Sequence, residues 1–258
     1  PGMLEHGHHV YTEEAALNTW EALSNFEGGK VAVVTGVPHK CPMVPLEVTF
    51  MMHDYFQERG ILDKVEFKYT YPIGRLHSLV NVGKWAEKEF DRLGIEYETL
   101  FNPKEIDDKQ VHSEEGTTVD YDLLMAIPPH KGMDTIEGNE LGTSGWIPTD
   151  RASLNVEGKE NAFVLGDTTN LPISKAGSTA HYEAEVLGEN LAAMVKKGRR
   201  VRDYDGKVFC FIEAGKDRAT FASFNYTTPP NPQPPTETVH WFKLAYNKLY
   251  WNSVRGLL

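Results

Sequence analysis

Strands and helices alternate along the first half of the chain, and this alternation restricts the fold more than any other feature. Runs rich in β-branched and aromatic residues predict strands at 30–36, 64–72 and 95–100. Segments with helical periodicity at 45–60 and 81–94 separate these strands. Strands joined through helices lie parallel in one sheet, and the helices cover its faces. The sequence therefore predicts an α/β fold built on a Rossmann-like, three-layer unit.

The loop after the first of these strands departs from a dinucleotide-binding loop. A G-x-G-x-x-G pattern set on Gly36 places Pro38 at its second glycine and Cys41 at its third. The second glycine normally lets the backbone approach a pyrophosphate, and the third lets helix and strand pack closely. Proline adds a ring and lacks an N–H donor. We therefore expect the unit to keep its fold and to bind NAD(P)H weakly.

Cys41 lies just ahead of a predicted helix, beside His39 and Lys40. A helix N-terminus and neighbouring cations favour the thiolate, so this position predicts a lowered thiol pKa and a reactive cysteine. The only other cysteine in the sequence is Cys210, and no CxxC or metal-binding spacing is present. The residues alone leave a second interpretation open, in which the two cysteines are unrelated packing thiols.

The second half of the chain contains a motif of a different kind. A predicted strand at 160–167 ends in Gly166 and Asp167, and a predicted helix follows at 179–198. Glycine at such a strand end lets a flavin's phosphate side approach, and the carboxylate accepts a hydroxyl. The helix N-terminus then favours the negative charge that a reduced flavin gathers. Lys175 adds a positive charge nearby. A plain strand–turn–helix with a capping aspartate remains the alternative.

The remaining segments complete the expected organisation. A helix capped by Thr12 is predicted at 12–26, a small hairpin with a returning strand at 104–129, and a second hairpin at 207–226. A proline-rich connector at 227–236 precedes an aromatic C-terminal helix. We divide the chain into four parts: a connecting segment and helix, a Rossmann-like domain with a degenerate glycine loop, a region with the Gly-Asp motif and its helix, and a C-terminal region with the second hairpin and the aromatic helix. Their expected bounds are 1–26, 27–125, 126–206 and 207–258.

Charge is unevenly distributed along the chain. The net charge of −11 argues against nucleic acid as the main partner. Residues 196–258, however, hold 11 Lys and Arg against 5 Asp and Glu. A basic tail on an acidic body suggests a surface for anions, including an anionic membrane. No apolar run is long enough for a transmembrane helix.

Several of these motifs together resemble one family. The stretches "KCPMVPLE", "LLMAIPPHKG", "FVLGDTTNLPISKAGSTAHYEAEVLGENL", "KVFCFIEAGKDRATF" and "HWFKLAYNKLYW" occur in the order expected for it. They resemble the sulfide:quinone oxidoreductase and flavocytochrome c sulfide dehydrogenase branch of the FAD-dependent pyridine nucleotide–disulfide oxidoreductases. The resemblance extends over essentially the whole chain. The glutathione reductase relatives keep an intact NAD loop and a CxxxxC pair, and this chain has neither.

The resemblance implies two dinucleotide-binding domains and FAD as cofactor. It identifies 27–125 as the NAD-type domain, 126–206 as the second half of the FAD domain and 207–258 as a redox-cysteine and membrane-interface region. It implies that Cys41 and Cys210 form a redox pair that oxidises sulfide to sulfane sulfur or polysulfide and passes the electrons to a quinone. Glu47 is a candidate for handling protons, although a carboxylate on a helix surface needs no such role. The resemblance also implies flavin contacts at Pro128, Gly166, Asp167, Lys175 and Gly177.

The C-terminal helix is expected to supply the quinone side. Phe242 resembles the aromatic side chain that lines the quinone pocket, and Trp241 is a weaker candidate. Aromatic and basic residues mixed on one helix suit a membrane interface, so we expect a peripheral membrane protein, on the cytoplasmic face. Packing of this helix on the body or on a dimer partner is the alternative, and a homo-oligomer is left open.

The first half of the FAD domain, with its own glycine motif, is expected ahead of Pro1 and is not in this sequence. The chain alone is therefore expected to bind FAD poorly. Two other functions remain open at this point. One is a type II NAD(P)H:quinone dehydrogenase, which the broken glycine loop disfavours. The other is a non-catalytic sulfur carrier or assembly subunit.

Overall fold

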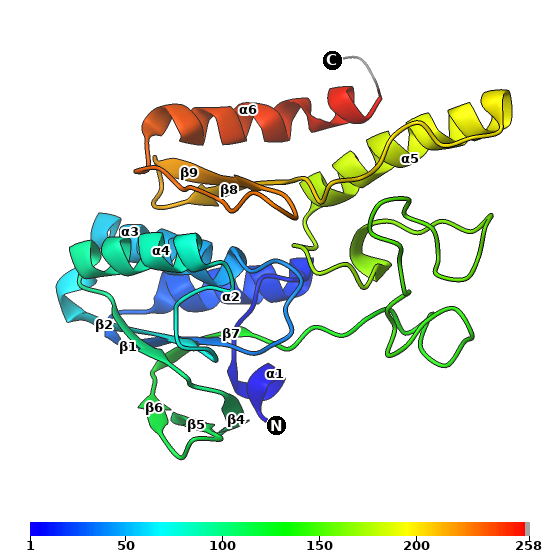
Figure 1. Cartoon of the computed structure of the whole chain (residues 1–258). Helices are drawn as coiled ribbons and strands as arrows, with labels where there is room; N and C mark the ends of the chain where they lie inside the picture. The colour runs from blue at the N-terminus through cyan, green and yellow to red at the C-terminus, as the bar shows by residue number, and fades with distance from the viewer. Residues whose placement is uncertain (256–258) are drawn as a thin grey trace.

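A four-stranded parallel sheet forms the centre of the molecule. The computed structural model describes residues 1–255, and its sheet has the strand order β3-β2-β1-β7, with every neighbouring pair parallel (Figure 1). The strands are β1 (Gly29–Thr35), β2 (Val65–Tyr71), β3 (Glu96–Thr99) and β7 (Leu123–Ile127). Helices α3 (Val44–Glu58) and α4 (Val80–Leu93) connect the first three strands. This arrangement confirms the predicted α/β, Rossmann-like unit.

The two faces of this sheet are covered differently. Val31 and Val33 of β1 point into a large core shared with the helices α3 and α4, whereas Ala32 and Val34 point into a smaller core on the other side. A three-stranded antiparallel sheet covers that second face, together with the short helix α1 (Met3–His6). Its strands are β4 (Pro103–Ile106), β5 (Gln110–Ser113) and β6 (Thr118–Asp120). This small sheet forms the third layer. It lies where a small hairpin was predicted, but it has three strands and not two.

Local sequence signals explain where several helices begin. Helix α2 (Glu13–Asn25) starts after Thr12, whose Oγ1 accepts the N–H of Ala15 at 3.2 Å. Helix α6 (Glu237–Val254) starts in the same way, because Thr236 Oγ1 accepts the N–H of Val239 at 3.2 Å. Both caps satisfy N–H groups that a helix N-terminus otherwise leaves without a partner.

The second predicted hairpin is present and bridges the core to the C-terminal helix. Its strands are β8 (Val208–Glu213) and β9 (Ala219–Phe224), paired antiparallel. Val208, Cys210 and Ile212 of β8 point into the large core. Helix α6 lies along the outer side of this hairpin (Figure 1). The hairpin is thus a layer between the core and α6.

Residues 128–206 contain one long helix and very little strand. Helix α5 (Gly177–Lys197) is present as predicted, preceded by the short 3₁₀ turn η2 (Gly166–Thr168). The strand predicted at 160–167 is wrong, because Phe163 makes only an isolated bridge to Asn155. A strand requires a neighbour that pairs with its backbone, and residues 1–255 supply no sheet in this region. This lack of a sheet agrees with the predicted incomplete FAD domain. The predicted last segment, 207–258, extends beyond the described residues at 256–258.

Candidate active site

The two cysteines lie together although they are far apart in the sequence. Cys210 on β8 is buried and Cys41, in the loop before α3, is half-buried. Cys41 packs against the same core cluster that contains Cys210, and both are free thiols. Ile173 and Ala176, just before α5, pack on this cluster too. Three elements therefore meet at the thiols: the loop before α3, strand β8 and the start of α5.

The thiols are less acidic than the sequence predicts. Burial raises the pKa of Cys41, and the N–H groups of Met43 and Val44 lower it by a smaller amount. The predicted helix N-terminus effect is therefore present, but the predicted lowered pKa is wrong because desolvation outweighs it. Burial, followed by the nearby Cys41, raises the pKa of Cys210 to about 12. In the reduced protein at neutral pH, both cysteines are accordingly protonated thiols.

Lys40 does not stabilise the Cys41 thiolate as expected, because its side chain is directed elsewhere. Its Nζ lies 3.4 Å from a carboxylate oxygen of Asp167. Its backbone N–H donates to Nδ1 of His130 at 2.8 Å. At least one backbone N–H of the loop, that of Lys40, therefore donates to a protein side chain and is not free to bind a pyrophosphate. The space beside Gly36, at the start of this loop, is also narrow. A Cβ at Gly36 would lie 2.6 Å from a ring carbon of Pro129.

Glu47 joins three elements beside the cysteines. Its Oε1 accepts the N–H of Glu213 at 2.9 Å and the ammonium of Lys243 at 2.8 Å. Lys243 also lies 3.5 Å from Glu213, and His240 Nδ1 lies 3.1 Å from that same carboxylate. Helix α3, strand β8 and helix α6 are therefore connected by one charged cluster. The carboxylate of Glu47 raises the pKa of both cysteines, which places it within electrostatic reach of the reactive atoms.

Sequence reasoning found Glu47 and missed its partners. His240 and Lys243 are three residues apart on α6, so they lie on one face of that helix. A histidine and a lysine at this spacing, among the aromatic residues of the helix, were the available signal. Their acceptor Glu213 lies on a strand whose packing against α6 could not be read from the sequence.

Gly166 and Asp167 occupy the sharp turn after the segment predicted as a strand. Gly166 has a φ of +74°, a conformation that favours glycine. Its N–H donates to a carboxylate oxygen of Glu183 at 2.5 Å. Glu183 is 1% exposed, and burial raises its pKa. This buried carboxylate on α5 holds the turn in place and was missed from the sequence, where it reads as an ordinary helix residue.

Lys175 and Gly177 lie at the start of α5, close to this turn. The ammonium of Lys175 donates to Thr169 Oγ1 at 3.0 Å and to the carbonyl of Leu171 at 2.9 Å. Burial lowers its pKa. Gly177 faces open space, and the helix has no side-chain cap at Ala176. The first N–H groups of α5 are thus not capped by a side chain.

A cavity of about 510 Å³ adjoins these groups, at the carboxyl ends of the parallel strands. Its lining includes side chains from the cysteine loop, the Gly-Asp region and the segment between them. Examples are His39, Lys40, His130, Trp146 and Lys175. Ligands of open α/β sheets bind outside the carboxyl ends of the strands. Pro128 leads from β7 toward this cavity but does not line it, whereas its neighbour His130 does.

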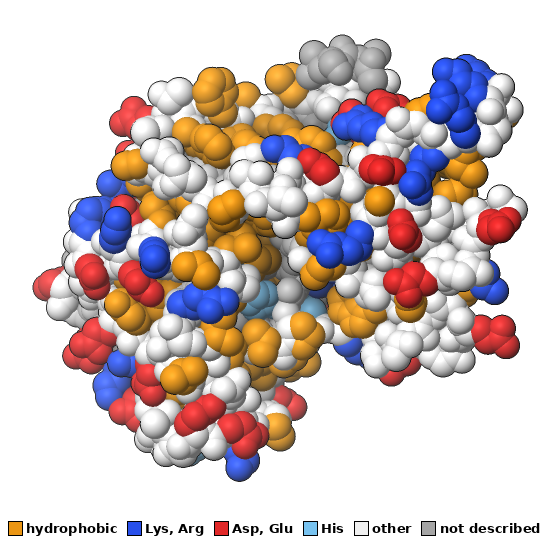
Figure 2. Space-filling view, viewed as in Figure 1, with side chains coloured by type: hydrophobic (Ala, Val, Ile, Leu, Met, Phe, Trp, Pro, Cys, Tyr) orange, Lys and Arg blue, Asp and Glu red, His pale blue; other side chains and the backbone are white. Residues whose placement is uncertain are grey.

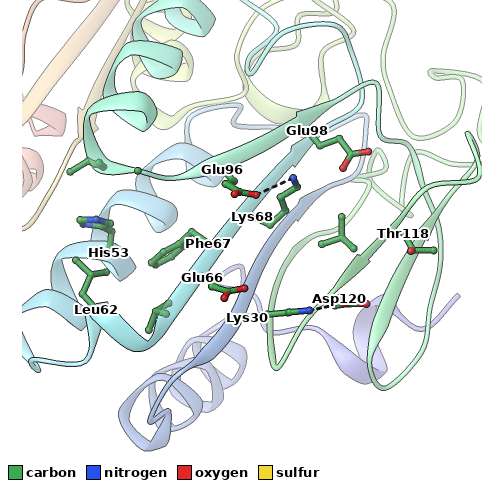
Figure 3. Close-up of a pocket in the computed structure, with 14 residues that line it drawn as sticks. Lys30, His53, Leu62, Glu66, Phe67, Lys68, Glu96, Glu98, Thr118 and Asp120 are labelled. Atoms are coloured by element: carbon green, nitrogen blue, oxygen red, sulfur yellow. Dashed lines mark hydrogen bonds and ion pairs between the residues drawn. The ribbon is translucent and has the colours of Figure 1, made fainter.

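A second hollow of about 510 Å³ lies at the opposite ends of the strands (Figure 3). Lys30 pairs with Asp120 at 2.7 Å across it, and Lys68 pairs with Glu96 at 3.5 Å. Residues 1–255 contain no cluster of His, Cys, Asp and Glu suited to a metal ion, in this hollow or elsewhere. We assign no site to it.

The predicted quinone residues are exposed on the C-terminal helix. Trp241 and Phe242 are 65% and 62% exposed on α6. The α6 aromatic that lies against the hairpin is Tyr246, whose ring centre is 6.0 Å from that of Phe211. None of the helices within residues 1–255 has both the length and the apolar character needed to cross a bilayer.

Comparison with known proteins places these motifs in context. No protein-family model matches the chain. Curated proteins named mitochondrial sulfide:quinone oxidoreductase match from Mus musculus, at 25% identity over 85% of this chain and 51% of that protein, and from Dictyostelium discoideum, at 27% over 84% and 50%. The expected resemblance to the sulfide:quinone oxidoreductases is confirmed. The chain spans about half the length of these relatives.

Solved structures show the same fold. The sulfide:quinone oxidoreductase of Aquifex aeolicus superposes with a TM-score of 0.81 over 97% of this chain and 65% of that one, at 19% identity. A structure of NDH2 from Plasmodium falciparum in complex with NADH gives a TM-score of 0.66 at 13% identity, with 96% of this chain and 70% of that one covered. A chain of the Tetrahymena thermophila mitochondrial ATP synthase gives 0.69 at 20%, over 87% of this chain and 59% of that one.

Proposed function

We propose that this chain supplies the redox cysteines and part of the FAD site of a sulfide:quinone oxidoreductase. The observation that carries the proposal is that Cys41 and Cys210 share one core cluster and that Cys41 is near enough to raise the pKa of Cys210. The two thiols are the only cysteines of the sequence, and Lys40, the residue before Cys41, lines the cavity at the carboxyl ends of the strands. The similarity to proteins named sulfide:quinone oxidoreductase supports the same assignment.

The residues present fit one side of an FAD. Gly166 leaves room for close approach, since a Cβ there would meet nothing nearer than 3.5 Å. The N-terminus of α5 has no side-chain cap, and the buried hydroxyl of Thr179 has no hydrogen-bond partner among residues 1–255. Lys175 and the α5 amides would stabilise negative charge on a flavin ring. Asp167 would accept a hydroxyl of the cofactor, in competition with Lys40. When bound, FAD supplies the two-electron acceptor between the cysteines and a quinone.

The cysteines act through thiol–disulfide chemistry. In the oxidised pair, HS⁻ attacks one sulfur, the S–S bond breaks, and a persulfide forms on one cysteine while the other leaves as a thiolate. A second HS⁻ removes the outer sulfur as HSS⁻ and leaves a thiol. Two electrons must then leave the pair before the disulfide re-forms. The raised pKa values of both thiols favour the thiolate as a proton acceptor as soon as it is released. Glu47 lies close enough to influence that proton electrostatically.

Helix α6 is proposed to bring the enzyme to the quinone. Trp241, Lys248 and Arg255 recur at seven-residue intervals, so they share the outward face of the helix. Exposed tryptophan mixed with cations suits a bilayer interface. The proposal therefore includes peripheral attachment to a membrane, on its cytoplasmic face, and a quinone as electron acceptor. Tyr246 contacts the hairpin through Phe211, whereas Phe242 is 62% exposed.

A non-catalytic role is the second candidate. The similarity to a chain of an ATP synthase shows that this fold also occurs within a large assembly. A subunit with a purely structural role does not require two clustered thiols or a glycine turn at Gly166. These two features therefore favour a catalytic role. The type II NADH dehydrogenase alternative is disfavoured because the Gly36 loop is narrow and the Lys40 amide is occupied.

Absorbance spectroscopy tests the proposal on protein isolated from the cells that make it. We expect a flavin spectrum that sulfide bleaches within seconds and NADH does not. Bleaching by NADH alone would favour the dehydrogenase alternative. A preparation without flavin, to which added FAD does not bind, would favour the non-catalytic role.

A further inference from the structure

The C-terminal end of α5 carries a dense cluster of cations on an acidic protein. Residues 196–202 read KKGRRVR and contain no acidic residue, whereas the whole chain has a net charge of −11. Arg200 pairs with Asp203 at 3.1 Å, and Arg202 pairs with carboxylates on α5. Lys196, Lys197 and Arg199 are exposed and have no ion-pair partner among residues 1–255. We call these three side chains the basic tip.

The basic tip projects from the body of the protein. Buried residues of α5 end at Ala193, so the last turn of the helix is outside the packed part. Figure 1 shows this end of α5 on the same side of the molecule as α6. In Figure 2, blue side chains gather at the upper right, where α5 ends, and hydrophobic side chains lie along the top, where α6 runs. The basic tip and the apolar helix thus share one side.

Because the basic tip and α6 lie on one side of the protein, a flat, extended surface such as a bilayer can contact both at once. Helix α5 has 21 residues and is about 30 Å long at 1.5 Å per residue, so its tip lies well away from the cysteines at its first turn. Electrostatic attraction between exposed charges falls off within about 10 Å in salt. The tip therefore acts only on a negative surface that comes close to it. A bilayer lying against α6 is such a surface.

We propose that the basic tip binds the headgroups of anionic lipids and forms a second membrane contact beside α6. This inference rests on the proposed function in one respect, that α6 lies at a bilayer. A single helix at an interface leaves the protein free to roll about the helix axis, and a second contact limits that motion. The tip would thereby fix how α5, whose other end reaches Cys210 and Cys41, is oriented to the membrane.

Vesicle binding by the purified 258-residue chain tests this directly, because it requires neither FAD nor activity. Affinity is measured on phosphatidylcholine vesicles with and without phosphatidylserine. Each basic residue near an anionic surface contributes about 1 kcal/mol, and 1.4 kcal/mol corresponds to tenfold in affinity. The double variant Lys196→Gln/Lys197→Gln should therefore bind phosphatidylserine vesicles roughly 25-fold more weakly. Its binding to pure phosphatidylcholine should be unchanged.

Matched controls separate this inference from the proposal for α6. Lys104→Gln/Lys109→Gln removes two exposed cations from the β4–β6 region, on the far side of the molecule in Figure 1, and should change neither affinity. Trp241→Ala/Trp251→Ala should weaken binding to both kinds of vesicle, which tests α6 alone. The inference is overturned if the tip variant binds phosphatidylserine vesicles like the parent, or if the Lys104/Lys109 variant loses as much affinity as the tip variant.

Discussion

Residues 29–127 and residues 128–206 show how differently two dinucleotide-type regions of one chain can be completed. The first region supplies every strand of its own sheet, and the two strands β1 and β7 are almost fully buried, whereas the edge strand β3 is not. The second has the Gly-Asp turn and the long helix α5 but no sheet among its described residues. Both regions carry the sequence pattern of a nucleotide-binding unit. The difference shows that a sequence pattern typical of a β-strand forms a strand only where a neighbouring strand can pair with its backbone.

The comparison also assigns different tasks to the two regions. The complete region has a glycine loop that departs from the dinucleotide-binding pattern, and that loop carries Cys41 just before α3. The incomplete region has kept the features that suit a flavin, including Gly166 and Lys175. Under the proposed function, the first region would present the thiol and the N-terminus of α5 would face the cofactor.

The largest effect is expected from substituting the cysteines, because they connect the first region to the flavin side of the second. In FAD-containing protein, Cys41→Ser and Cys210→Ser should each reduce sulfide-dependent flavin reduction by roughly a thousandfold or more, the scale on which removal of a nucleophile acts. FAD should remain bound. Stopped-flow absorbance measures the rate, and Met43→Leu in the same core cluster serves as the control. A cysteine variant that reduces flavin at the parent rate would remove that cysteine from the mechanism.

Hydrogen exchange sharpens the contrast in backbone pairing. Amides of Val31–Val34 are paired on both sides within the sheet and should exchange only when the domain opens, roughly a thousandfold or more slower than unpaired amides. The segment around Phe163 has one isolated bridge, with the Val164 N–H donating to Leu154 at 3.0 Å, and its amides should exchange faster than those of β1 in the 258-residue chain. Mass spectrometry of peptides resolves the two. Equal protection from exchange in both segments would contradict the contrast, because it would show that residues 160–165 are paired in a continuous sheet.

A matched pair of valine truncations tests the same contrast in energy. Val33→Ala in the sheet should lower the free energy of unfolding by about 2 kcal/mol, from two lost methyl-sized groups and the cavity left behind. Val33 is 0% exposed in the large core, whereas Val164 is 8% exposed in a small cluster. Val164→Ala should therefore cost less than about 1 kcal/mol. Urea unfolding measures both, and a larger loss at Val164 would contradict the contrast.

The smallest effect concerns the charged cluster beside the thiols. The Glu47 carboxylate raises the pKa of both cysteines, so Glu47→Gln should lower both values. At a fixed pH below those values, a larger thiolate fraction should make iodoacetamide react faster with Cys41 and Cys210. Lys243→Met leaves Glu47 without its 2.8 Å ammonium partner and should slow the same reaction. Alkylation rates that respond to neither substitution would show that the cluster is only structural.

Much of the fold could be predicted because it depends on local signals. The Thr12 cap, the β-branched run at 30–36 and the five-proline connector all act within a few residues of themselves. The strand at 160–167 was predicted wrongly because its fate depends on a partner outside the segment. The thiol pKa was predicted in the wrong direction for a related reason. A helix terminus is visible in sequence, but the burial of Cys41 by β8 and α5 is not.

The site shows the same division. Cys41, Gly166 and Lys175 could be found because each belongs to a short motif. Glu183, which holds the turn at Gly166, and Lys243, which pairs with Glu47, act through contacts between distant elements. Phe242 was named from the resemblance and stays a prediction; the contact of Tyr246 with Phe211 depends on how α6 packs on the hairpin, which the sequence does not show.

The measurement that most directly tests the central claim is mass spectrometry of the oxidised chain digested without reductant. If Cys41 and Cys210 are a redox pair, treatment with sulfide and a mild oxidant should yield one cross-linked peptide that joins them, directly or through added sulfur. The link should form within a single molecule, at a yield independent of protein concentration. Two unlinked peptides, or links only between molecules, would contradict the account and leave two separate packing thiols.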